Sequence, residues 1–248
     1  VADLSTGNAS LHPEVRRHEV GPRGSLFMVA DGMGGAAAGE LASAMAADLI
    51  YHHLATAWVT DDDASPDRFA FRMKEAVELA NQKIYGYARE HPEVRGMGTT
   101  VTAAGVNGHD LYLAQIGDSR AYLVRNGEAI QLTKDQSLMQ RLVDAGELTE
   151  EEAEQSERRN IILQALGPDP RVISVEARGE DDRADMELDL LAGVLVIDGL
   201  CLADFFAQTA ALLLGIGETE TVLRVDGPRV RDRLGEEGEN GLTASQLL

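Results

Sequence analysis

The chain contains 248 residues, of which 44% are hydrophobic and only 4% aromatic, and its formal net charge is −20. This charge excludes a nucleic-acid partner, because phosphate backbones are bound mainly through Lys and Arg. The length suits one layered domain with a sizeable core, so we treat residues 1–248 as a single domain.

Neither a membrane span nor an internal disulfide is expected. The most apolar region, residues 188–216, is interrupted by Asp189, Asp198 and Asp204, which leaves no uncharged stretch of about 18 residues. No signal peptide with a basic start and an apolar middle is present. The single cysteine, Cys201, is compatible with a reducing compartment. We therefore expect a cytoplasmic monomer.

The first elements alternate between strand and helix. Residues 25–30 (Ser-Leu-Phe-Met-Val-Ala) are an apolar run bounded by glycines, which predicts a buried strand. Residues 41–49 carry Leu, Met and Leu at a spacing of four and predict a helix. Ser65 and Pro66 suit the cap and the first position of a second helix, which carries apolar residues at helical spacing and ends near residue 91.

A block rich in strands follows. It has four apolar runs, at residues 99–106, 111–116, 120–124 and 129–132. Asn-Gly pairs separate the first run from the second and the third from the fourth, and such pairs between apolar runs are strong hairpin signals. The block predicts an antiparallel meander.

The rest of the chain predicts further helices and strands. Thr149 with Glu152 forms a capping-box pattern that opens a short helix. Strands are expected at residues 172–177, 193–197 and 221–225, and a helix at residues 202–214. Strands in runs and helices in pairs favour an α+β fold with antiparallel sheets over a doubly wound parallel sheet.

Three apolar strands end in an aspartate beside a glycine. These aspartates are Asp31, Asp118 and Asp198. One Asp-Gly pair is usually an ordinary turn, because both residues favour turns. Three carboxylates emerging from core strands are costly to desolvate unless a cation meets them, and no Lys or Arg is paired with them by position. Mg²⁺ or Mn²⁺ would meet the need, since these ions select oxygen ligands.

Several segments resemble successive motifs of one enzyme family. They are residues 29–35 (Val-Ala-Asp-Gly-Met-Gly-Gly), 96–100 (Gly-Met-Gly-Thr-Thr), 117–120 (Gly-Asp-Ser-Arg) and 132–138 (Leu-Thr-Lys-Asp-Gln-Ser-Leu). In order and spacing they resemble the bacterial 2C-type (PPM) metal-dependent Ser/Thr protein phosphatases. Residues 142–149 and 159–167 resemble that family's flap, so we name residues 134–170 the flap-like segment. The resemblance is close over residues 25–170 and weak elsewhere.

The resemblance implies a fold, two metal ions and a reaction. The family has a four-layer α-β-β-α sandwich, with two mainly antiparallel sheets flanked by helix pairs, and a water that bridges two Mn²⁺ or Mg²⁺ ions attacks phosphorus. By motif, Asp31 would bridge both metals and Gly32 would offer its carbonyl oxygen. Asp198 would bind the second metal, and Asp118 would join it in holding a third, weaker ion. Asp31 and Asp198 are thus the implied catalytic residues.

The two ends of the chain depart from the family pattern. The family opens with an Arg before Asn-Glu-Asp, whereas this chain has Asn8-Ala9-Ser10. The family's last metal aspartate is replaced by Glu239, whose longer side chain could substitute for it. Cys201 is not a thiol-phosphatase nucleophile, because the arginine six positions later that such a loop requires is Ala207. The six histidines have no acid at a paired spacing and are interpreted as surface residues.

Two functions therefore remain open. The first is metal-dependent hydrolysis of phosphoserine and phosphothreonine on proteins, acting on a Ser/Thr kinase or its targets. The second is a catalytically impaired pseudophosphatase that serves as a binding or regulatory module. The altered segment at residues 8–10 favours the second, and the run of motifs favours the first. A purely structural acidic β-sandwich leaves the motifs unexplained.

Overall fold

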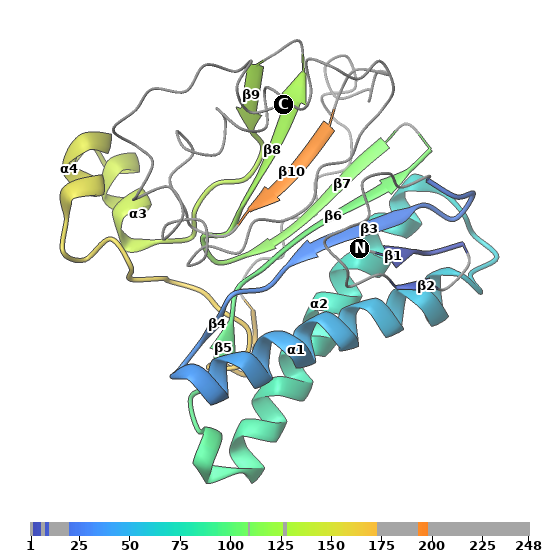
Figure 1. Cartoon of the computed structure of the whole chain (residues 1–248), viewed down its shortest axis with the longest axis horizontal. Helices are drawn as coiled ribbons and strands as arrows, with labels where there is room; N and C mark the ends of the chain where they lie inside the picture. The colour runs from blue at the N-terminus through green and yellow to red at the C-terminus, as the bar shows by residue number, and fades with distance from the viewer. Residues whose placement is uncertain are drawn as a thin grey trace, which may run out of the picture.

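A computed structural model describes residues 2–5, 8–9, 20–108, 110–125, 128–172 and 193–197 of the chain. Within these ranges it is a mixed structure of helices and antiparallel sheets (Figure 1). No described helix is both long and apolar enough to cross a bilayer.

The larger sheet has five strands in the order β2-β1-β3-β6-β7, and every neighbouring pair is antiparallel. Its strands are β1 (Ala2–Asp3), β2 (Asn8–Ala9), β3 (Ser25–Val29), β6 (Val101–Asn107) and β7 (Asp110–Ile116). Strand β3 confirms the buried run predicted at residues 25–30. The first Asn-Gly hairpin is also confirmed, because Asn107 pairs with Asp110 across the turn.

Two smaller sheets complete the described strands. The strands are β8 (Arg120–Arg125), β9 (Glu128–Gln131) and β10 (Gly193–Ile197), in the order β10-β8-β9, and the pair β4 (Gly32–Met33) and β5 (Gly98–Thr99). The predicted meander is therefore wrong in one respect, because its two hairpins belong to different sheets. A turn signal is local, whereas the sheet that a hairpin joins depends on which apolar face it buries.

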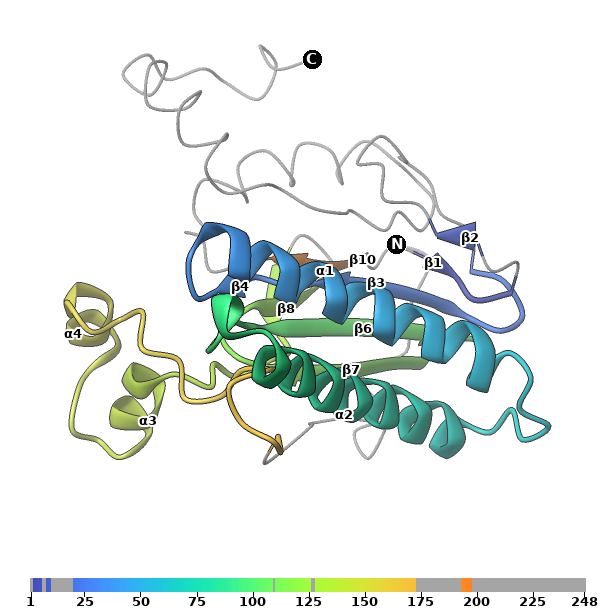
Figure 2. The same cartoon turned by 90° about the horizontal axis from the view of Figure 1, so that it is seen from below.

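Two long helices lie side by side across one face of the larger sheet (Figure 2). Helix α1 (Ala36–His53) continues through the π-helical turn η1 (Leu54–Trp58), and α2 (Pro66–Glu90) returns beside it and is followed by the 3-10 turn η2 (Pro92–Val94). The start of α2 is as predicted: the Ser65 hydroxyl accepts a hydrogen bond from the backbone N–H of Arg68 at 3.3 Å, and Pro66 opens the helix.

The flap-like segment contains two short helices, α3 (Leu138–Asp144) and α4 (Glu150–Gln155). The predicted capping box is confirmed, because the Thr149 side chain accepts from the backbone of Glu152 and the Glu152 carboxylate accepts from the backbone of Thr149. The strands and helix predicted at residues 172–177, 202–214 and 221–225 lie outside the described residues, except for Val172.

Two apolar cores divide the described structure into three layers. Between the helices and the larger sheet, three fully buried aromatic rings are in contact, with centroids 4.9 Å apart for Trp58 and Phe69 and 5.0 Å apart for Phe69 and Tyr112. The second core lies between the two larger sheets and consists of Phe27, Ala104, Val106, Leu111, Leu113, Ala121 and Leu123. The order of layers is therefore helix pair, sheet, sheet.

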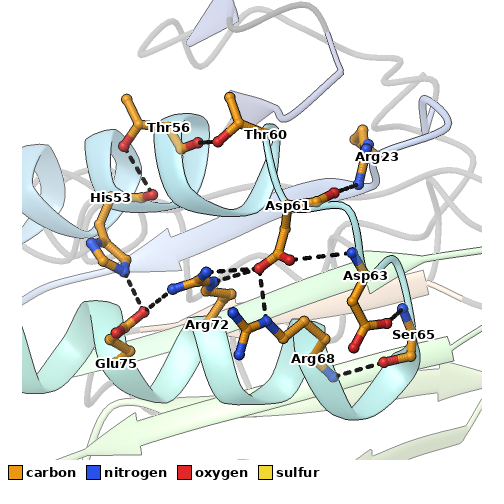
Figure 3. A network of polar contacts seen from close by, with 10 residues as sticks. All are labelled: Arg23, His53, Thr56, Thr60, Asp61, Asp63, Ser65, Arg68, Arg72 and Glu75. Carbon is orange, nitrogen blue, oxygen red and sulfur yellow. Dashed lines mark hydrogen bonds and ion pairs between the residues drawn. The ribbon is translucent and has the colours of Figure 1, made fainter.

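An ion-pair network joins α1, α2 and the loop between them (Figure 3). The Asp61 carboxylate accepts hydrogen bonds from Arg68 at 2.7 Å and from Arg72 at 2.8 Å. Arg72 also donates to Glu75 at 2.6 Å, and Glu75 contacts His53 of α1 at 2.9 Å. The hydrogen bond from Arg68 is the main reason that the pKa of Asp61 is lowered to about 2.

This network predicts how stability depends on pH. Because the pKa of Asp61 is lower in the folded chain, its ionised form stabilises the fold above its ordinary pKa of 3.8, and this contribution is lost as the pH falls toward about 2. Asp61→Asn should therefore lower the melting temperature at about pH 6, with the difference from wild type shrinking toward about pH 2. Asp62→Asn is the matched control. A difference that stays constant with pH would contradict this assignment.

Candidate metal centre

Asp31 lies just past the end of β3 with its backbone held on both sides. Its N–H donates to the Thr100 hydroxyl at 3.0 Å, and its carbonyl oxygen accepts from the Thr100 N–H and from the Thr99 hydroxyl, both at 2.9 Å. The Asp31 carboxylate, in contrast, has no hydrogen bond or ion pair with any described residue. The site therefore fixes the main chain of Asp31 and leaves its carboxylate available to a ligand.

The glycines after Asp31 are required by close packing. A Cβ added to Gly32 would lie 2.0 Å from the carbonyl oxygen of Gly39, in the first turns of α1. Gly34 and Gly35 have φ angles of +104° and +93°, a conformation that L side chains rarely adopt. The double glycine therefore lets the chain turn sharply from Asp31 into α1.

Asp118 lies in the short turn that carries the chain from the larger sheet to the second sheet. Gly117 precedes it with a φ of +104°, and an added Cβ there would lie 2.7 Å from Thr100. The Ser119 hydroxyl is 2.8 Å from the Thr100 hydroxyl, which also binds the Asp31 N–H. Thr100 thus joins the turns that carry the two aspartates.

The two aspartates share an electrostatic environment that favours a cation. Asp31 is exposed, but partial loss of hydration near its neighbours raises its pKa. Burial also raises the pKa of Asp118, and the negative charges of Asp135 and Asp31 raise it further, against a smaller opposing effect from Arg120. A hard divalent cation would relieve the repulsion, and carboxylate oxygens are the ligands it prefers. The residues present therefore fit a Mg²⁺ or Mn²⁺ site.

Arg120 lies near Asp118 in the chain, but its guanidinium is already paired with another carboxylate. Its guanidinium binds the Asp135 carboxylate through two hydrogen bonds, of 2.8 and 2.6 Å. This pairing is the main reason that the pKa of Arg120 is raised. Asp135 is thus the hydrogen-bonded partner of Arg120, whose charge acts on Asp118 only weakly.

Two of the predicted ligands, Asp198 and Glu239, lie outside the described residues. Ile197, the residue before Asp198 in the sequence, pairs with Arg120 at the end of β10. Within the described ranges, no group of three His, Cys, Asp or Glu side chains gathers as a metal cluster. The described half of the predicted site consists of Asp31, Gly32 and Asp118.

The N-terminal departure from the family pattern is described only in part. Asn8 and Ala9 form β2, whose Ala9 pairs with Ala2 at the edge of the larger sheet. Ser10 lies outside the described residues. The replacement of the family's two acidic residues by Ala9 and Ser10 is therefore known from the sequence alone.

Sequence reasoning missed the residues that hold the two aspartates. The sequence predicts no role for Thr99 and Thr100 beyond their motif, yet both are fully buried and both bind Asp31. Gln136 was also given no role, although its side chain accepts a hydrogen bond from the Gly117 N–H at 2.8 Å. The sequence shows only two adjacent threonines before a strand. It does not show their contacts, because these join segments far apart in the chain.

A family model described as protein phosphatase 2C matches residues 15–167, which is more than half of the chain. The Ser/Thr protein phosphatase PstP of Mycobacterium tuberculosis is 41% identical over 159 residues, a match that covers 63% of this chain and 30% of PstP. The Ser/Thr phosphatase stp of Listeria welshimeri is 38% identical over 148 residues, which is 59% of this chain and 57% of stp. The chain thus matches less than two thirds of the length of these curated relatives.

Solved structures agree with these relatives. A crystal structure of the M. tuberculosis phosphatase PstP has a TM-score of 0.53 and 35% identity, and the match covers 66% of this chain and 69% of that one. The Streptococcus agalactiae Ser/Thr phosphatase has a TM-score of 0.54 and 31% identity, with coverage of 75% and 72%. The catalytic domain of PstP in complex with two manganese ions has a TM-score of 0.51 and 33% identity, with coverage of 66% and 69%.

Proposed function

Because this chain belongs to the protein phosphatase 2C family, we propose that it hydrolyses phosphoserine and phosphothreonine on proteins in a metal-dependent reaction. The observation that carries the proposal is that Thr100 joins the turns of Asp31 and Asp118, whose mutual repulsion Arg120 offsets only in part. Relatives named Ser/Thr phosphatases support the substrate class.

We assign the metal ligands as the sequence predicts them. Asp31 and Asp198 would be the catalytic ligands, Gly32 would contribute a carbonyl oxygen, and Glu239 would take the place of the family's last metal aspartate. Asp118 would hold a third ion with Asp198. Two bound Mn²⁺ or Mg²⁺ ions would supply an activated water and neutralise charge on the phosphoryl oxygens. The manganese-bound relative supports the choice of ion.

The chain's own contribution is to fix these ligands before a substrate arrives. Thr99 and Thr100 hold the backbone of Asp31, so the main chain that carries its carboxylate is fixed before a cation binds. The bidentate Asp135 engages the Arg120 guanidinium, so Arg120 offsets the charge of Asp118 only in part. The site thus concentrates negative charge where a cation, and then an anionic phosphoester, would be bound.

We also propose the wider organisation that the sequence predicts. The helix pair, sheet and sheet that are described would be completed by a second helix pair, giving the four-layer α-β-β-α sandwich as one domain over residues 1–248. Residues 134–170 would act as its flap. We place the protein in the cytoplasm as a monomer that acts on a Ser/Thr kinase or its targets, in keeping with its single cysteine.

The test is phosphate release from a phosphothreonine peptide by the full chain as Mn²⁺ is increased. We expect release to saturate with Mn²⁺, to return to background with a chelator, and to persist in Cys201→Ser, which tests a thiol mechanism. Glu239→Ala should raise the Mn²⁺ concentration needed for half-maximal rate. An absence of turnover at saturating Mn²⁺ would contradict the proposal and favour a pseudophosphatase.

A further inference from the structure

Gln136, near the start of the flap-like segment, links the returning end of that segment to the turn before Asp118. Its side-chain oxygen accepts hydrogen bonds from the Gly117 N–H at 2.8 Å and from the Gln164 side chain at 3.1 Å. Its backbone N–H donates to the Gly117 carbonyl oxygen at 2.9 Å, and its carbonyl oxygen accepts from Leu163 at 2.8 Å. One residue therefore binds both polar groups of Gly117 and the returning end of the flap-like segment.

These contacts lie where the two ends of the flap-like segment meet. Ser137 forms a bridge with Ile162, and the Leu138 N–H donates to the Ile161 carbonyl oxygen at 2.9 Å. Helices α3 and α4 extend from this junction at the same end of the molecule as β4 and β5 (Figure 1). A movement of the flap-like segment relative to the sheets would therefore act directly on Gln136.

The same returning end also reaches Asp31. The N–H and carbonyl groups of Leu166 and Thr99 exchange hydrogen bonds of 3.0 and 2.9 Å, and the Thr99 hydroxyl binds the Asp31 carbonyl oxygen. The buried Asn81 side chain fixes the next residue by accepting from the Gly167 N–H at 2.8 Å. The Asp31 side of the junction is thus anchored to α2. On the Asp118 side, Thr100 and Thr102 hold Ser119. Gln136 adds the contact that links Gly117 to the flap-like segment.

The hydrogen bonds from Gln136 matter most at Gly117. It has a φ of +104°, and glycine has more backbone freedom than any other residue. Without the Gln136 side chain, the Gly117 N–H would have no hydrogen-bond acceptor among the described residues. The direction of the next side chain, Asp118, would then be poorly fixed.

We propose that Gln136 is a positioning residue that fixes the Asp118 carboxylate for metal binding and couples it to the flap-like segment. This inference rests on the proposed metal centre. Because coupling between two sites is reciprocal, occupation of the Asp118 metal site should steady the flap-like segment, and a substrate that engages this segment should tighten that metal site.

The test measures Mn²⁺ binding by calorimetry, in the absence of substrate. Gln136→Met keeps the length of the side chain and removes its acceptor, and it should weaken the weakest class of Mn²⁺ sites about tenfold. Gln136→Glu keeps the oxygen that Gly117 and Gln164 use, and it should bind Mn²⁺ at least as tightly as wild type. Wild type and Gln136→Met carry the same charge at this position, so weaker binding in Gln136→Met reports a loss of geometry rather than a loss of charge.

The matched control is Gln131→Met. Gln131 is also an amide with two side-chain contacts, to the Tyr122 hydroxyl at 3.1 Å and to the Thr133 carbonyl oxygen at 2.7 Å, but it does not contact Gly117. It should leave Mn²⁺ binding unchanged. If Gln136→Met lowers only the melting temperature, or if Gln131→Met weakens Mn²⁺ binding equally, the residue is merely structural and the inference is wrong.

Hydrogen exchange gives a second readout with a milder variant. Mn²⁺ should slow amide exchange over residues 138–160 in wild type. Gln164→Met removes the hydrogen bond from Gln164 to Gln136, but Gln136 still accepts from Gly117. In this variant the slowing should be reduced. Unchanged slowing would overturn the coupling. Turnover enters neither experiment, so a failure of this inference can be told apart from a failure of the proposed activity.

Discussion

Asp31→Asn is expected to lower kcat/KM for a phosphopeptide by roughly a thousandfold, which corresponds to about 4 kcal/mol of transition-state stabilisation. Asparagine preserves the shape of the side chain and its backbone contacts with Thr99 and Thr100, but it removes the charge that a divalent cation would bind. The rate should be measured at saturating Mn²⁺ with a phosphothreonine peptide, and Asp62→Asn is the control at an exposed aspartate.

The melting temperature shows whether Asp31→Asn loses activity through loss of metal binding or through a folding defect. The pKa of Asp31 is raised by loss of hydration, so its ionised form opposes folding at neutral pH in the absence of a cation. Asp31→Asn should therefore leave the melting temperature of the metal-free chain unchanged or slightly raised, and it should abolish the increase that Mn²⁺ produces in wild type. Normal turnover in Asp31→Asn would show that Asp31 is not a metal ligand. A clearly lower melting temperature of the metal-free variant would show that Asp31 has a structural role instead.

The sequence predicted local features of this fold well. Buried runs, caps and Asn-Gly turns depend on neighbouring residues, and β3, the start of α2 and the capping box at Thr149 are all confirmed. The division of the two hairpins between two sheets could not be predicted in the same way. It depends on the burial of residues such as Phe27 and Leu123 between those sheets.

The same contrast holds within the candidate site. The glycine-flanked aspartates could be identified from the sequence because each ends an apolar run, and in the structure Thr100 joins the turns that carry Asp31 and Asp118. The contacts that hold them come from Thr100 and Gln136, which belong to other segments of the chain. Such contacts leave no periodic or compositional pattern, so only the tertiary structure reveals them.

Arg120→Met is expected to destabilise the chain by about 2–3 kcal/mol, because it leaves Asp135 as an unpaired and largely buried carboxylate. The Asp135 side chain is only 11% exposed, whereas that of Arg120 is 35% exposed, and this partial exposure keeps the expected cost below that of a fully buried pair. Urea unfolding of the metal-free chain at neutral pH measures the free energy.

The double variant Arg120→Met/Asp135→Leu decides whether the ion pair or the packing of Arg120 matters. If the cost comes from the stranded carboxylate, the double variant should be more stable than Arg120→Met alone, because replacing both partners by apolar side chains removes the unpaired charge. It should also lower the pKa of Asp118, since the charge of Asp135 helps to raise it. Additive free energies in the double-mutant cycle would show that Arg120 and Asp135 contribute independently, and that the arginine is held near the site for its packing rather than for its charge.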